Sequence, residues 1–507
     1  MEQDKSKSAK IDIAGLTIYF ELFYINNFYQ YLRDKFIAYH PKQGWDAVPI
    51  ILSIIFLNLV GLDCIDDIAF LAKDVGFVLM FRQYLRRSMT SSEWRTWRKR
   101  FNSCCHGALP CGTVIKDFLN YCHDPETMVG IKGTAKIHKA SEQIHKLLDV
   151  LHWTQKSLWS QTKSKVITLD QDATLVRTHK IKALYGYAGF KSYQPVNVYS
   201  NELDAIIHTE FRDGNVPAKM SLMEMLQDSI NTLPSSIETI YYRGDSASCQ
   251  HEFMKKMASG TLVEGRGVVY FAVSALINKH IKKLYANINE ADWKLYNQKN
   301  KQEYAEVLYY ESWMSPLKPM RLIFIRTKQK SERAKLKEQQ KADPNYRQLS
   351  LDLVDDDGQD IDDTFETDNS EYSIRGILSN VPEFKYKSAA LIKWARERCG
   401  KSEELHAIQK DDLAGGKMPS GKFGANYAWW VCTCISFNLN AMIKTVAIPA
   451  ELMNSRFKAI RSKIIYCAGT ISVASRGFKV RIANALKLRL ITEIIENLWS
   501  KYVVPDV

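Results

Sequence analysis

The spacing of hydrophobic and polar positions changes along the chain and divides it into regions of different structure. Residues 1–150 show helical periodicity, and helical spacing returns over 388–416 until Gly415 and Gly416. Between 166 and 276, short apolar runs alternate with turn-forming residues, which is typical of strands. The pattern therefore predicts a helical N-terminal region followed by an α/β core.

The central region predicts a specific order of elements. Strands are expected first at 166–172, 195–200 and 205–212, and a helix is expected at 219–233 because Met220, Met223, Leu226 and Ile230 share one face. A strand at 237–246, a helix at 249–259 and a strand at 267–276 follow. The predicted order is β-β-β-α-β-α-β.

Acidic residues stand at the ends of two of these strands. The segment VITLDQDATLV (166–176) carries Asp170 and Asp172, and the fourth strand ends at Asp245 in YYRGDSAS. Aspartate also favours turns, so its presence at strand ends can be purely structural. If the first and fourth strands are neighbours and parallel, however, Asp172 and Asp245 meet at the sheet edge where α/β proteins bind ligands.

A third carboxylate is available in the predicted helix at 388–416. Glu403 and Lys410 are seven residues apart, so they are expected to project from one helix face. Glu404 is an alternative to Glu403, as Asp170 is to Asp172. Converging carboxylates repel one another unless a cation lies between them, and oxygen ligands suit Mg²⁺.

The net charge favours a polyanionic partner. The 507-residue chain has a formal net charge of +13 and a pI near 9.0, which suits nucleic acid or an anionic membrane surface. The segment TSSEWRTWRKRFN predicts a helix with a Thr90–Glu93 capping box. Its cations suit phosphate contacts, and the alternative is an amphipathic helix with Trp94 and Trp97 inward. These cations are Arg95, Arg98, Lys99 and Arg100.

Other classes of protein and site are disfavoured. The charged start MEQDKSKSAKID lacks the apolar region of a signal peptide, and the apolar run 48–62 is short for a membrane span, so it is expected to be a buried core helix. Ten cysteines without an export signal indicate a reducing compartment. The Cys and His residues between 104 and 123 lack paired zinc spacing. The acidic stretch 355–366 has Gly358 fourth, where a calcium loop needs glycine sixth.

Several motifs together resemble those of a known family. The chain resembles the DDE transposases of bacterial insertion sequences, in the branch with a β-strand domain inserted into an RNase H-like core and a Tyr-x2-Arg-x3-Glu-x6-Lys signature. The matching segments lie between 166 and 440. They are LDQDATLV, GYAGFKSYQPV, FRDGNVPA, YRGDSAS and GKSEELHAIQKDDLAGGKMPSGKFGAN, the last followed by SFNL.

This resemblance implies an α/β fold with an RNase H-like mixed sheet flanked by helices and interrupted by a β-rich insertion. It implies five regions. They are a helical DNA-binding region (1–150), the first part of the catalytic core (151–276), the inserted domain (277–385), the second part of the core (386–445) and a basic C-terminal region (446–507).

The resemblance also implies site residues. Asp172, Asp245 and Glu403 would bind two Mg²⁺ ions, for which Mn²⁺ can substitute, and Lys410 would contact a DNA phosphate. The signature positions for Tyr and Arg hold Arg396 and Cys399 instead. Arg398, one residue further from the glutamate, is the candidate for the arginine's role in binding DNA.

The function implied is that of a transposase of the bacterial cytoplasm, associated with the nucleoid. It would bind the terminal inverted repeats of its element, cleave there, and join the 3′-hydroxyls to target DNA. Bringing two ends together implies a homodimer on double-stranded DNA, with no membrane partner. The alternatives are a metal-dependent nuclease of the same fold without strand transfer, and a non-catalytic transposase-derived DNA-binding protein.

Overall fold

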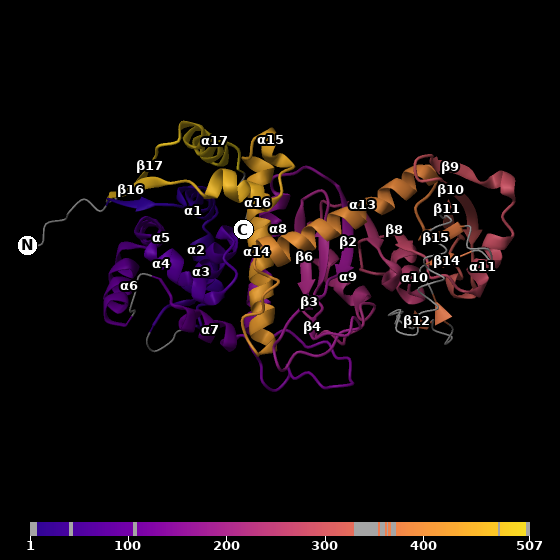
Figure 1. Ribbon diagram of the computed structural model, residues 1–507, viewed down its shortest axis with the longest axis horizontal. Coiled ribbons are helices and arrows are strands. Elements are labelled where there is room, and N and C mark those ends of the chain that lie inside the picture. Colours follow the sequence, from indigo (N-terminus) through magenta and orange to yellow (C-terminus); the bar gives the residue numbers. More distant parts are fainter. Residues whose placement is uncertain are drawn as a thin grey trace, which may run out of the picture.

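The computed structural model describes most of the chain (Figure 1). The described residues are 8–39, 44–104, 109–328, 372–474 and 477–502, with short strands at 353–354, 360–361 and 364–366. Most of the predicted acidic loop at 355–366 lies outside the described residues.

A ten-stranded mixed sheet forms the centre of the molecule. β2 (Val166–Ala173) pairs in parallel with β7 (Thr239–Gly244), and β7 pairs in parallel with β8 (Val269–Ser274). β5 (Val196–Ser200) is antiparallel to β2. Nine strands follow one path and β14 (Thr364–Glu366) pairs beside it with β15. The path is β6 (Ala205–Glu210), β5 (Val196–Ser200), β2 (Val166–Ala173), β7 (Thr239–Gly244), β8 (Val269–Ser274), β15 (Tyr372–Ser379), β11 (Met320–Lys328), β10 (Gln302–Tyr309) and β9 (Lys294–Asn297).

The predicted order of elements in the central region is confirmed. Strands β2, β5 and β6 precede α9 (Leu222–Asn231), and α10 (His251–Ser259) connects β7 to β8. A short hairpin of β3 (Val176–Arg177) and β4 (Ser192–Tyr193), not predicted from the sequence, lies between β2 and β5. The parallel pairing of β2 and β7 places the ends of these two strands at the same edge of the sheet.

The segment 277–385 extends the central sheet. After α11 (Lys279–Ala286), its strands β9, β10, β11 and β15 form an antiparallel continuation, and β15 pairs with β8 through Leu378 and Val273. These strands cover the edge that β8 would otherwise expose, and an unpaired edge favours aggregation. The β-rich segment therefore shares one sheet with the core (Figure 1).

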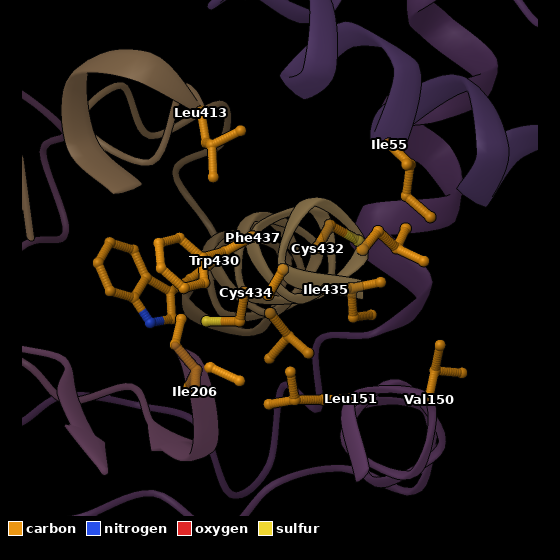
Figure 2. Close-up of a cluster of buried hydrophobic side chains, with 14 of the residues drawn as sticks. Ile55, Val150, Leu151, Ile206, Leu413, Trp430, Cys432, Cys434, Ile435 and Phe437 are labelled. Carbon is orange, nitrogen blue, oxygen red and sulfur yellow. The ribbon is translucent and has the colours of Figure 1, made fainter. Parts of the chain in front are cut away.

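The helix α14 (Phe423–Val446) stands between the N-terminal helices and the sheet (Figure 1). It is buried along most of its length. Figure 2 shows Ile55 of α3, Leu151 of α8 and Ile206 of β6 converging on it beside Trp430 and Ile435. Burial on all sides explains why most residues of this helix are apolar.

The helical character predicted for the N-terminal region is confirmed. The helices are α1 (Thr17–Ile25), α2 (Phe28–Lys35), α3 (Ala47–Val60), α4 (Ile68–Lys73), α5 (Val75–Ser88), α6 (Ser91–Cys104), α7 (Gly112–Tyr121) and α8 (Glu142–Trp159). Every residue of α3 is buried, as expected for the apolar run 48–62. In the part of the chain that is described, no single helix is long and apolar enough to cross a membrane, and one pair, α3 with Ile65–Lys73, meets that test only across a 95° bend.

The two ends of the described chain meet in a second sheet. Strand β1 (Ser8–Ile11) pairs with β16 (Gly469–Ala474), which pairs with β17 (Gly477–Ile482). Helix α17 (Ala485–Lys501) then packs on α1. The short helices α15 (Ala450–Met453) and α16 (Phe457–Ile460) connect α14 to this sheet.

Candidate active site at the ends of β2 and β7

Asp172 and Asp245 lie at the edge predicted for them. Asp172 is the second-last residue of β2, and Asp245 follows directly after the end of β7. Asp245 begins a short 3-10 turn, where its Oδ1 accepts a hydrogen bond from the Ala247 N–H at 3.1 Å. The local sequence thus fixes the second aspartate at a helical N-cap, a position that favours Asp.

Arg398 of α13 (Ser388–Ala407) links the two aspartates. Its Nη1 lies 3.4 Å from Asp172 Oδ2. Burial alone would lower the pKa of Arg398, but the charges of Asp172 and Asp245 raise it above its usual value. Burial likewise raises the pKa of Asp172, against the opposing effects of Arg398 and of a hydrogen bond with Ser402. A cationic side chain therefore offsets part of the negative charge of this edge.

The choice between Asp170 and Asp172 is decided by the partner of each carboxylate. Asp170 accepts two hydrogen bonds of 2.6 Å from Arg243, which stands directly opposite on β7. Arg243 also donates to the Trp394 carbonyl at 2.6 Å. Because both side chains are buried, this is a structural ion pair, and Asp172 is the acid nearer the open end of the strand.

The face of α13 that meets the sheet edge differs from the prediction. Ser402 is buried and hydrogen-bonds with Asp172, whereas Glu403 is exposed. Lys410 donates to Thr174 Oγ1 at 3.1 Å. Lys410 therefore contacts the residues that follow β2, whereas Glu403 is exposed.

A π-helical turn, Ile408–Asp412, follows α13 and contains Lys410. A π-turn holds more residues than an α-turn, because its backbone hydrogen bonds span five residues instead of four. The sheet edge is consequently contacted by Ser402 and Lys410, eight residues apart. Glu404 points elsewhere, and it lines a cavity of about 600 Å³ with Tyr199 and Lys444.

Sequence reasoning missed Ser402 and Thr174 as neighbours of the site. The spacing of Arg398 and Ser402, one helical turn apart, was the available signal for a shared face. His406, one turn further, is buried, and burial together with the charges of Lys410 and Arg398 lowers its pKa to about 3. Its imidazole is therefore neutral at physiological pH.

The donor atoms at this edge suit a divalent cation. Asp172 and Asp245 supply carboxylate oxygens, the ligands that Mg²⁺ prefers, at a point where Arg398 now provides positive charge. Within the described ranges, no group of three or more His, Cys, Asp or Glu side chains is placed to hold a metal ion. Glu403, the third carboxylate expected from the sequence, is exposed in this structure.

The basic helix α6 has the geometry of the amphipathic alternative. Glu93 and Thr90 form the predicted capping box, with bonds of 2.7 Å and 3.3 Å. Trp94 and Trp97 stack with ring centroids 5.1 Å apart, and Trp97 is buried. Three of the cations, Arg95, Arg98 and Lys99, are exposed, and the side chain of Arg100 lies outside the described residues. An exposed cationic face is compatible with phosphate contacts as well.

A pair of neighbouring histidines on α8 and β6 predicts that the free energy of unfolding depends on pH. His152 Nε2 of α8 and His208 Nδ1 lie 3.3 Å apart, and burial lowers the pKa of these residues to about 4 and about 3. Because a histidine of the unfolded chain binds its proton near pH 6.5, the contribution of the two neutral rings to the free energy of unfolding is fully present above about that pH. It is lost as the pH falls, by up to ~1.4 kcal/mol per pH unit for each histidine. Urea unfolding between pH 7 and pH 5 measures the slope.

The substitution His208→Gln is expected to reduce this slope by about one proton, because it removes one of the histidines whose pKa is lowered by burial. His280→Gln is the matched control, since His280 is exposed. Equal slopes for the wild type and the His208 variant would show that the pair does not control acid stability.

With this geometry established, comparison with known proteins gives one match to a protein family. Residues 126–337 match the family model for transposase DDE domain group 1. The match covers less than half of the chain. It includes β2 and β7 with Asp172 and Asp245, and it ends before α13 with Glu403. The segment that builds the aspartate edge is therefore similar to transposase DDE domains.

Further comparisons add little. No curated protein matches the chain. Among solved structures, the chain is similar to the piggyBac transposase in a synaptic complex with hairpin DNA, at 9% sequence identity and a TM-score of 0.40. That similarity covers 98% of this chain and 84% of the other. A likeness this low does not specify a function.

Proposed function

We propose that the protein is a DDE transposase of a bacterial insertion sequence, acting in the cytoplasm on DNA. The observation that carries this proposal is the pair of aspartates at the ends of two neighbouring parallel strands, within a segment that matches transposase DDE domains. The strands β6, β5, β2, β7 and β8 would form its RNase H-like core. Fold alone does not give function, so the site residues bear the argument.

In this proposal Asp172, Asp245 and Glu403 hold two Mg²⁺ ions. When bound, two such ions activate the attacking oxygen and stabilise the leaving oxygen of an in-line displacement at phosphorus. Asp172 and Asp245 are already at one edge, and the single positive charge of Arg398 offsets part of their negative charge. Glu403, exposed on the last turn of α13, would supply the third carboxylate.

Cationic groups around this edge would position the DNA backbone. Lys410 is held beside Thr174, two residues beyond Asp172, and it would contact a phosphate next to the scissile bond. The exposed cations of α6 would bind the duplex further away, in a sequence-independent manner that sets affinity. Two copies of the chain would hold the two terminal inverted repeats together.

The test uses the DNA that flanks the gene as a labelled duplex with the full chain. We expect nicking at the boundary of the terminal repeats with Mg²⁺, none with EDTA, and joining of the new 3′-hydroxyls to a plasmid target. A duplex with the repeat sequence scrambled is the control and should remain uncut. Absence of cleavage on every duplex and with Mg²⁺ or Mn²⁺ would overturn the proposal.

The exposure of Glu403 favours one second candidate, a transposase-derived protein that binds DNA without cutting it. The same experiment separates the two functions. Binding of the repeat duplex without cleavage by the wild-type chain would support the second candidate.

A further inference from the structure

The hairpin of residues 176–193, formed by β3 and β4, follows the end of β2 and starts close to Asp172. β3 begins at Val176, four residues after Asp172, and pairs with β4 through Arg177 and Ser192. The hairpin is anchored to the rest of the protein, because Ala183 and Ser192 are buried and the Tyr193 hydroxyl accepts a hydrogen bond from Asn426 at 3.1 Å. The hairpin is thus a rigid projection next to the candidate site.

Large apolar side chains at the tip of this hairpin are exposed. The exposed fractions are 88% for Ile181, 63% for Tyr185 and 52% for Tyr187. The tip is nevertheless ordered by its own backbone, since the Gly186 N–H bonds to the Phe190 carbonyl at 2.9 Å. Lys191 lies 6.0 Å from the centre of the Tyr185 ring and donates to the Ile181 carbonyl at 2.7 Å. Exposed apolar groups on an ordered support indicate a binding surface.

Positive charge gathers beside Ile181 of the same hairpin. His179, Lys180 and Lys182 of the hairpin and Lys422 of the segment before α14 line a hollow of about 470 Å³. Both Lys182 and Lys422 lie close enough to His123 to affect its pKa. Burial lowers that pKa most, and the charges of Lys422 and Lys182 lower it further. Among the described residues, none of the three lysines forms an ion pair. A polyanion is the ligand that this charge fits.

Aromatic rings beside lysines form the recognition surface of proteins that bind single-stranded nucleic acid. Bases stack on exposed rings, and lysines contact the phosphates between them. A closed duplex hides the faces of its bases, whereas a strand that is opened for cleavage exposes them. We propose that the 176–193 hairpin binds unpaired nucleotides of the DNA at the cleavage site, with Tyr185 and Tyr187 as stacking platforms and Lys180, Lys182 and Lys422 as phosphate contacts. This inference rests on the proposed function.

An anionic membrane surface is the other polyanion that binds exposed aromatic and basic groups. The position of the hairpin favours DNA. It continues the strand that carries Asp172, and Lys410 contacts Thr174 between that strand and the hairpin. A membrane bound there would cover the candidate active site.

The test measures binding by fluorescence anisotropy with the full chain in EDTA, which prevents cleavage. The probes are a blunt duplex, the same duplex with an unpaired 3′ extension, and phosphatidylserine–phosphatidylcholine vesicles. We expect the double substitution Tyr185→Ala and Tyr187→Ala to weaken binding of the extended duplex by about tenfold or more, with binding of the blunt duplex changed by less than about twofold. The double Phe variant should bind as the wild type does, because it keeps both rings.

Tyr310→Ala is the matched control, since Tyr310 is also exposed (46%) but lies beyond the end of β10. Equal binding of both duplexes by the wild type, unchanged by the double Ala substitution, would overturn this inference while leaving the proposed function intact. Vesicle binding that depends on the tyrosines, with no effect on DNA, would replace it with a membrane role. Failure of the wild type to bind any DNA would overturn the proposed function as well.

Discussion

Replacing Asp172, Asp245 or Glu403 by the corresponding amide is expected to reduce metal-dependent DNA cleavage by about 10³-fold or more, while DNA binding changes little. An amide keeps the size of the side chain but lacks the charge that binds a divalent cation. The loss corresponds to about 4 kcal/mol of transition-state stabilisation, within the several kcal/mol that a catalytic metal ion supplies. Cleavage rates with Mg²⁺ at saturating DNA measure the effect, and gel-shift titrations measure binding.

Glu404→Gln is the matched control for Glu403→Gln. The two residues are neighbours in α13, but Glu404 lines the cavity with Tyr199, and its Oε2 lies 3.8 Å from Lys401 Nζ. Cleavage by the Glu404 variant should stay within a few-fold of the wild type. If the two variants exchanged these effects, Glu404 would be the third acid. If both retained full activity, the third ligand would not come from this turn.

Breaking the buried pair of Asp170 and Arg243 is expected to destabilise the fold strongly. Arg243→Met removes the partner of a fully buried carboxylate and leaves the Trp394 carbonyl without its donor. Loss of one member of a buried ion pair costs about 3–5 kcal/mol, because the remaining charge stays desolvated. Urea unfolding followed by circular dichroism at pH 7 measures the change in free energy.

A second ion pair joins the same two neighbouring strands at their other end and serves as the control. Lys165 Nζ lies 2.6 Å from Glu238 Oε1, but both side chains are more than half exposed. Glu238→Gln should therefore change the free energy of unfolding far less than Arg243→Met does. A loss of similar size for the two pairs would show that burial is not what makes the Asp170–Arg243 pair essential.

The sequence by itself determined the elements of the core. Alternating and helical periodicities identified β2, β5, β6, α9, β7, α10 and β8 in their correct order, because each element must bury one face. The apolar run within 48–62 was correctly predicted to be a buried helix. The strand-end positions of Asp172 and Asp245 were likewise readable, because an apolar run that stops at an acid marks the end of a buried strand.

Only the tertiary structure decided which polar groups meet. Asp170 and Asp172 lie two residues apart on one strand, and the sequence cannot rank them, since the partner Arg243 is 73 positions away from Asp170. Similarly, α13 places Ser402, one turn after Arg398, toward Asp172 and leaves Glu403 exposed, and the π-turn that follows changes the face of Lys410. The helical period assumed from the sequence is regular, and one extra residue in a turn is enough to change the face that a side chain occupies.

Longer-range arrangements were also decided by packing. The strands within 277–385 joined the central sheet because the edge of β8 was available for pairing, which no local pattern reveals. The terminal strand β1 found its partner β16 more than 450 residues away. The sequence therefore determined what each segment becomes through its own periodicity, whereas contacts between distant segments, formed to bury apolar faces and pair charges, decided which side chains build the site.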